Sequence, residues 1–153
     1  MDPFSITAGS AGLLLFCTKI LTEGASFFQG VKGASAAVNQ IVADLNGVKS
    51  ILAQLKDAEE GRGSFRDTVP RDMRKTLKGV LSACDATLRR LEEFMYKYYD
   101  VRRSGWRRIK WDRVGEAAAR KLAEDLAGCK STLTLHLSFI NMLVIATLYF
   151  ALT

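Results

Sequence analysis

The residues able to do chemistry are few and lie far apart along the chain. The single histidine, His136, stands between Leu135 and Leu137 in an apolar stretch. One histidine without converging carboxylates or thiols forms neither a metal site nor a catalytic triad. We interpret His136 as a core or interfacial residue, and we predict no catalytic residue and no bound metal.

The other reactive groups also lack suitable partners. The three cysteines, Cys17, Cys84 and Cys129, are widely spaced, and each lies in an apolar helical pattern. This arrangement fits neither a disulfide framework nor paired metal ligands, so we expect reduced core residues in a reducing compartment. The glycine-rich fragment 61–64 lacks the Gly-Lys-Ser/Thr ending of a phosphate-binding loop and is interpreted as a linker. We predict that the protein is not an enzyme and uses no cofactor.

The most basic segment, residues 101–113, has the sequence VRRSGWRRIKWDR and mixes cations with two tryptophans. Tryptophan beside Lys and Arg is typical of peripheral proteins that hold anionic membranes. The lipid contacts expected here are Arg102, Arg103, Trp106, Arg107, Arg108, Lys110, Trp111 and Arg113. Two other interpretations stay open. A tryptophan could close the end of a helical bundle while the arginines are solvated, or both tryptophans could stack on single-stranded nucleic acid, the least favoured partner.

Both ends of the chain are apolar and uncharged. No charge occurs between Phe4 and Thr18, and none occurs from Ser131 to Thr153 if His136 is neutral. Such a stretch is either the core helix of a bundle or a segment that enters a membrane. The first is somewhat short for a span of about 20 residues, whereas the second is long enough. We favour 131–153 as the end of a bundle helix, with a membrane anchor as the alternative, because its leucines continue the spacing that begins at Ala118.

The elements that must position these segments are helices. The 153 residues, with two prolines and a net charge of +6, fit one folded domain over 1–153. Apolar residues recur at steps of three and four, which predicts helices over about 3–31, 36–60, 70–100 and 112–152. We therefore predict an all-α bundle of four long helices with an apolar N-terminal helix. The charges on the outer face of the third helix, which include Arg71, Arg74 and Lys75, are interpreted as a solvated face.

Two strings of residues resemble one known family. The opening MDPFSITAGSAGLLLF is similar to the start of fungal HeLo-like domains, the N-terminal effector modules of fungal NOD-like (STAND) receptors. The string IKWDRVGEAAARKLAEDLAGCKSTLTLHLSFIN is similar to the second signature of that family. The matching positions are Lys110, Trp111, Leu122, Leu126, Lys130, Ser131, Leu133, Leu135 and Leu137. The two strings in this order extend the resemblance over essentially the whole chain.

The resemblance implies a function in regulated cell death. HeLo-like domains are related to the HeLo domain and to the four-helix bundle of the mixed-lineage kinase-like pseudokinase, which permeabilise membranes once oligomerised. The segment that would be released and inserted corresponds here to Phe4–Leu21. Its membrane-inserting residues would be Phe4, Ile6, Leu13, Leu14, Leu15, Phe16, Ile20 and Leu21, and its small residues Ala8, Gly9, Ala11 and Gly12 would allow close helix approach in the oligomer.

The implied partners are anionic membrane lipids, further copies of the chain, and an upstream NOD-like receptor or amyloid signalling domain. The implied location is the cytoplasm at rest and the plasma membrane after activation. The alternative function is a non-enzymatic oligomerisation or adaptor module without membrane activity, whose apolar ends are buried between subunits.

Overall fold

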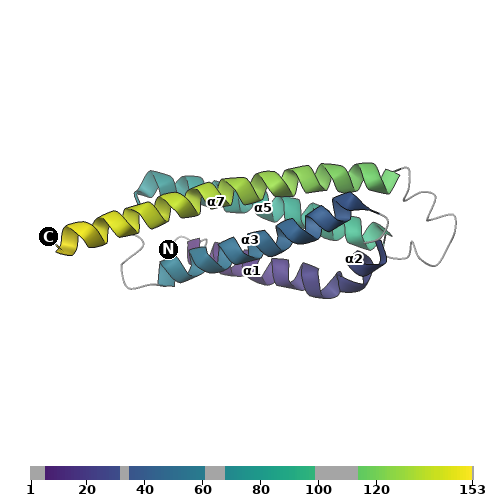
Figure 1. The fold of residues 1–153 in the computed structure, drawn as a ribbon, viewed down its shortest axis with the longest axis horizontal. Helices are drawn as coiled ribbons and strands as arrows, with labels where there is room; N and C mark the ends of the chain where they lie inside the picture. The colour runs from purple at the N-terminus through teal and green to yellow at the C-terminus, as the bar shows by residue number, and fades with distance from the viewer. Residues whose placement is uncertain (1–5, 32–34, 61–67, 99–113, 153) are drawn as a thin grey trace.

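The computed structural model describes residues 6–31, 35–60, 68–98 and 114–152. These residues form five α-helices and no strand (Figure 1): α1 (Ile6–Glu23), α2 (Ala25–Val31), α3 (Ala36–Glu60), α5 (Arg71–Tyr98) and α7 (Glu116–Leu152). The predicted all-α class is confirmed. The observed bounds of α3 coincide with the predicted helix over 36–60, and those of α5 and α7 lie within the ranges predicted for the last two helices.

The long helices lie side by side along one axis (Figure 1). α1 and α5 run in one direction, and α3 and α7 run in the other. α1 packs against α3 and α5, and α7 packs against the same two helices. As a result, the first residues of α1, the end of α3, the start of α5 and the end of α7 all lie at one end of the molecule.

The single helix expected over 3–31 is divided at Gly24 into α1 and α2. The amide of Gly24 donates to the carbonyl of Ile20 at 2.8 Å, and the amide of Phe28 donates to the carbonyl of Gly24 at 2.9 Å. A Cβ at Gly24 would lie 2.6 Å from that Ile20 oxygen and 2.6 Å from Cε of Met95. Glycine therefore allows α2 to turn toward α5, where the ring of Phe27 meets the edge of Phe94 at 6.0 Å.

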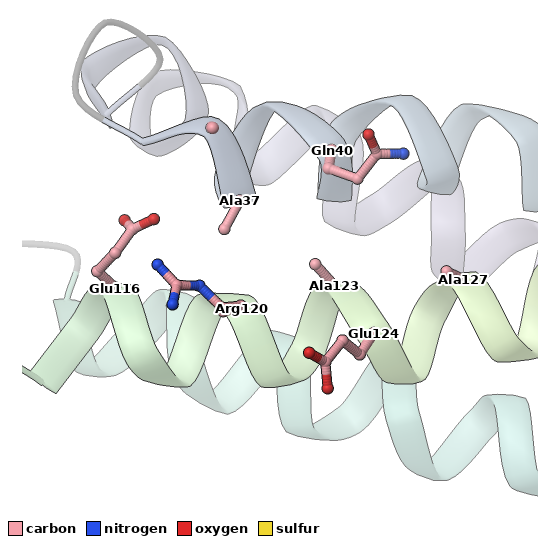
Figure 2. Close-up of a pocket in the computed structure, with 8 residues that line it drawn as sticks. Ala37, Gln40, Glu116, Arg120, Ala123, Glu124 and Ala127 are labelled. Atoms are coloured by element: carbon pink, nitrogen blue, oxygen red, sulfur yellow. The ribbon is translucent and has the colours of Figure 1, made fainter.

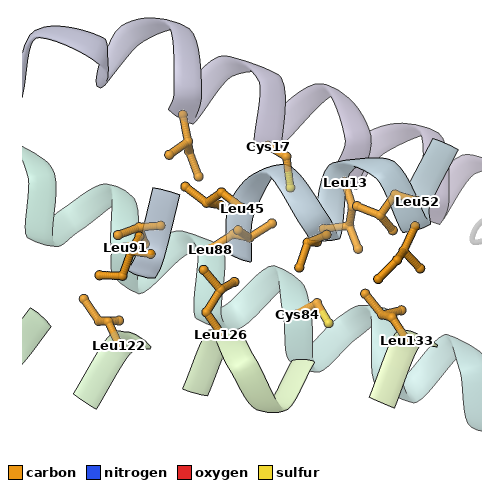
Figure 3. Packing of buried hydrophobic residues seen from close by; sticks show 14 of the residues in the cluster. Leu13, Cys17, Leu45, Leu52, Cys84, Leu88, Leu91, Leu122, Leu126 and Leu133 are labelled. Atoms are coloured by element: carbon orange, nitrogen blue, oxygen red, sulfur yellow. The ribbon is translucent and has the colours of Figure 1, made fainter. Parts of the chain in front are cut away.

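The core is one continuous apolar cluster to which all five helices contribute. Figure 3 shows part of it: Leu13 and Cys17 from α1, Leu45 and Leu52 from α3, Cys84, Leu88 and Leu91 from α5, and Leu122, Leu126 and Leu133 from α7. The start of α3 is fixed by Ser35, whose Oγ accepts a hydrogen bond from the amide of Val38 at 3.1 Å. Such a cap satisfies a donor that the first helical turn leaves unpaired, and it is typically worth about 1 kcal/mol.

Candidate membrane-interaction site

The last turns of α7 form an apolar surface that the bundle does not cover. Ile140 is the last buried residue of the helix. Beyond it, Ile145 is 67% exposed, Phe150 is 76% exposed and Leu152 is 87% exposed. The large apolar side chains exposed in this part of the helix are Met142, Val144, Ile145, Leu148, Tyr149, Phe150 and Leu152. We call residues 141–152 the apolar end of α7.

This exposure follows from the relative lengths of the helices. α7 has 37 residues, whereas α3 has 25 and α5 has 28. In Figure 1, the yellow end of α7 extends past the end of α3 and the start of α5. Twelve residues follow Ile140 in the helix, which at ~1.5 Å per residue extend about 18 Å. The neighbouring helices therefore provide no surface against which most of these side chains can pack.

The apolar end of α7 has the composition of a lipid-facing helix. It contains no acidic or basic residue, and exposed apolar side chains occur on all of its faces. A helix that is apolar all round is typical of a protein core or a membrane. Within the described residues, α7 is the one helix long and apolar enough to cross a membrane, and only 11% of its most apolar window is buried. Burial in the core of this chain therefore does not explain its composition.

The predicted membrane-inserting residues of α1 divide between the core and the surface. Leu13 and Ile20 are buried, and Leu14, Phe16 and Leu21 are partly buried against the core. Leu15 is 72% exposed. Phe4 lies outside the described residues, and Ile6 lies in the first turn of α1, where its side chain is not described. In the bundle, α1 is thus a core helix with one exposed apolar position.

The small residues proposed for close helix approach do not share one environment. Gly9 and Ala11 are partly buried, and a Cβ at Gly9 would lie 3.4 Å from Leu81. Gly12 is exposed, and no atom lies within 4 Å of the position of its missing Cβ. Ala8 lies in α1, but its side chain is not described. Of Gly9, Ala11 and Gly12, whose environments are described, Gly12 alone is open to approach by another helix.

The predicted lipid contacts between Arg102 and Arg113 lie outside the described residues. The helices that flank this segment are α5, which ends at Tyr98, and α7, which begins at Glu116. Both of these helix ends lie at the end of the molecule opposite the end of α7 (Figure 1). The two features that suggested membrane contact in the sequence, the basic segment and the apolar chain ends, are therefore attached to opposite ends of the bundle.

An ion pair between a buried carboxylate and a partly exposed lysine ties α7 to α3. Nζ of Lys130 lies 3.3 Å from Oδ1 of Asp44, which also accepts a hydrogen bond from Nε2 of Gln40 at 3.2 Å. The Asp44 side chain is 4% exposed, whereas that of Lys130 is 42% exposed. Gly47 makes room for the lysine, because a Cβ there would lie 2.7 Å from Cε of Lys130. This pair fixes the position of α7 along α3.

The cysteines are free thiols in different environments. Burial raises the pKa of the Cys17 thiol to about 12. Two effects raise the pKa of the Cys84 thiol: the larger is its hydrogen bond with Cys129, and the second is burial. On α7, the hydrogen bond with Cys84 lowers the pKa of half-buried Cys129 to about 6, and the hydroxyl of Thr87 at 3.6 Å and the charge of Arg90 act in the same direction. Cys129 combines a lowered pKa with the greatest exposure of the three thiols, so we expect it to react first.

An open depression of about 420 Å³ lies between the starts of α3 and α7. Figure 2 shows Gln40 from α3 and Glu116, Arg120 and Glu124 from α7 around it. The rest of its lining is alanine, and it contains no thiol, hydroxyl or imidazole. Among the described residues, no group of three or more His, Cys, Asp or Glu side chains could hold a metal ion. We assign no ligand to this depression.

In comparisons with known proteins, no family model, no curated protein and no solved structure matches the chain. The fold and the exposed surface therefore define the class of protein. It is an all-helical bundle in which one helix carries an exposed apolar end.

We did not predict from the sequence that the last turns of α7 would be exposed, but the predicted helix lengths contain the relevant signal. A last helix over 112–152 exceeds a neighbour over 36–60 by about 16 residues. That excess has to project from the bundle wherever the two helices start at the same level.

Proposed function

We propose that the protein is a membrane-targeting effector domain of fungal regulated cell death, in heterokaryon incompatibility or innate immunity. Its functional unit would be a bundle of four long helices, α1, α3, α5 and α7, with α2 as a short extension of α1. The domain would be cytoplasmic at rest and would act at the plasma membrane after oligomerisation by an upstream NOD-like receptor or amyloid signalling domain. The resemblance of residues 1–16 and 109–141 to HeLo-like domains supports this assignment.

The observation that carries the proposal is the apolar end of α7. A surface with Ile145, Leu148 and Phe150 all more than half exposed is unfavourable in water and favourable in lipid. Burying one large apolar side chain is worth roughly 1.5–3 kcal/mol. The uncharged first turns of α1 lie at the same end of the molecule (Figure 1). Both apolar elements could therefore meet one membrane.

Permeabilisation would require a second step, the release of α1. Leu13 and Ile20 are buried in the bundle, so their loss from the core costs roughly 1.5–3 kcal/mol each. Lipid and neighbouring copies of α1 would offset this cost. Oligomerisation would thus favour a state that a single bundle does not populate.

The test is flotation of the chain with phospholipid vesicles, together with dye release from them. Ile145→Glu with Leu148→Glu should abolish both, because charged residues are strongly disfavoured in hydrocarbon. The matched control, Gln54→Glu with Ser82→Glu, changes the net charge equally at exposed positions on α3 and α5. Equal binding by the two folded variants would contradict the proposal.

The second candidate function is a structural adaptor, and the same exposed surface motivates it. Copies of the chain could bury the apolar end of α7 against one another rather than in lipid. This function predicts soluble oligomers that do not float with vesicles. Sedimentation analysis would then show oligomers for the wild type and their loss in the Ile145→Glu, Leu148→Glu variant. Neither protein would bind vesicles in the flotation assay.

A further inference from the structure

The start of α5 carries three cations and one acidic residue, Asp72, which forms an ion pair with none of them. Arg71 and Lys75 are exposed, and Arg74 is half-buried with its Nε buried and without a hydrogen-bond partner. None of the three forms an ion pair with a described residue. Farther along the bundle, some cations are paired: Lys19 with Glu92, Arg89 with Asp85, Arg90 and Lys121 with Asp125, and Lys130 with Asp44. Others, such as Lys49, Lys97 and Arg120, form no ion pair with a described residue.

These cations lie level with the first turns of the apolar end of α7. Arg90 of α5 contacts Asp125 of α7 at 3.0 Å, and the two helices run in opposite directions. Moving 19 residues from Arg90 back to Arg71 corresponds to moving 19 residues from Asp125 forward to Val144, because every α-helical residue rises ~1.5 Å. The charged start of α5 is therefore beside the point where α7 leaves the bundle.

The opposite side of this bundle end is acidic. α3 runs parallel to α7, with Asp44 beside Lys130. Asp57, 13 residues after Asp44, therefore lies level with Leu143, 13 residues after Lys130. Asp57 and Glu60 are exposed, and no described residue pairs with them. An anionic surface would thus attract the α5 side of this end and repel the α3 side.

We propose that Arg71, Arg74 and Lys75 bind the headgroups of anionic phospholipids while the apolar end of α7 enters the hydrocarbon layer. The bundle then stands on the membrane by this end and tilts toward α5. This inference rests on the proposed membrane function. It also differs from the sequence-based expectation for the segment 102–113, which is attached about 42 Å away at the other end of the 28-residue α5.

The test compares two variants that remove the same charge, one from the start of α5 and one from the segment that follows its end. One carries Arg71→Gln, Arg74→Gln and Lys75→Gln, and the matched control carries Arg102→Gln, Arg103→Gln and Arg107→Gln. Each is floated with phosphatidylcholine vesicles with and without phosphatidylserine, at low and high salt. Each cation near an anionic surface contributes about fivefold to binding, so the first variant should lose roughly 100-fold on anionic vesicles. The control should stay within a few-fold of wild type.

A third variant tests whether the acidic residues on the α3 side weaken binding to anionic membranes. Asp57→Asn with Glu60→Gln should increase binding to anionic vesicles several-fold and leave binding to neutral vesicles unchanged. Equal losses for the two Gln variants, or a larger loss for the 102–107 variant, would overturn the inference while leaving the membrane function intact. If the wild type binds no vesicle of either composition, the proposed function itself fails. Circular dichroism checks that each variant is folded.

Discussion

The substitution Cys17→Leu tests whether release of α1 limits membrane permeabilisation. The Cys17 side chain is fully buried and points from α1 toward the leucines of α3 and α5 (Figure 3). A larger apolar side chain in a packed core typically costs about 1–3 kcal/mol. The released α1 does not bear this cost, and leucine suits a lipid environment better than cysteine does. The substitution therefore destabilises only the bundled state.

The size of the effect follows from the same free energy. A cost of about 2 kcal/mol raises the ratio of released to bundled α1 by roughly 30-fold. Urea denaturation should show a less stable protein, and dye release at equal amounts of bound protein should be faster by up to this factor. The control is Leu15→Phe, which enlarges an apolar side chain that is 72% exposed and should leave stability unchanged.

Two results would refute this reasoning. The first is a destabilised Cys17→Leu protein whose dye release per bound molecule equals that of wild type, because α1 release would then not limit the reaction. The second is fast dye release by Cys17→Leu when Ile145→Glu and Leu148→Glu are also present. In that case the apolar end of α7 would not be needed for membrane contact.

Three further predictions concern the bundle itself. Lys130→Met should destabilise the fold by about 1–3 kcal/mol, because it leaves the buried Asp44 carboxylate without its cation. Asp44→Ala should cost less, and the reverse order in urea denaturation would contradict this account. Gly24→Ala should lower the melting temperature, because the new Cβ would lie 2.6 Å from the backbone oxygen of Ile20. Gly12→Ala should instead stabilise α1 by about 0.5–1 kcal/mol, because no atom lies within 4 Å of the position of its Cβ. Iodoacetamide should modify Cys129 before the other thiols. The rate should fall as the pH drops below about 6, because the Cys129 thiolate is then protonated. Peptide mass spectrometry locates the label, and preferential labelling of a buried cysteine would contradict the prediction.

The sequence predicted a helix boundary well where a single local residue, such as a helix cap, determines it. The start of α3 follows from Ser35, whose hydroxyl caps the helix, and its buried face follows from the spacing of Val38, Ile41 and Leu45. The division at Gly24 was not predicted. Glycine is tolerated inside a helical pattern, and the need for it arises from contacts with Met95, a residue on another helix.

The candidate site was harder to predict because it depends on the register between helices. The apolar end of α7 looks like any core helix until its neighbours are seen to end before it does. Likewise, Arg71, Arg74 and Lys75 look like an ordinary solvated face. Their level beside Val144, where α7 leaves the bundle, sets them apart from the other cations of the bundle.

The energetics of the two apolar elements suggest an order of events. The apolar end of α7 is already exposed, so its entry into lipid gains burial and breaks no contact in the bundle. Release of α1 removes Leu13 and Ile20 from the core, and its cost is a large fraction of the roughly 5–15 kcal/mol that stabilises a typical domain. Attachment through α7 should therefore precede release of α1. Attachment also concentrates copies of the chain on one surface with the start of α1 at the same end, which favours the association that can offset the cost of release.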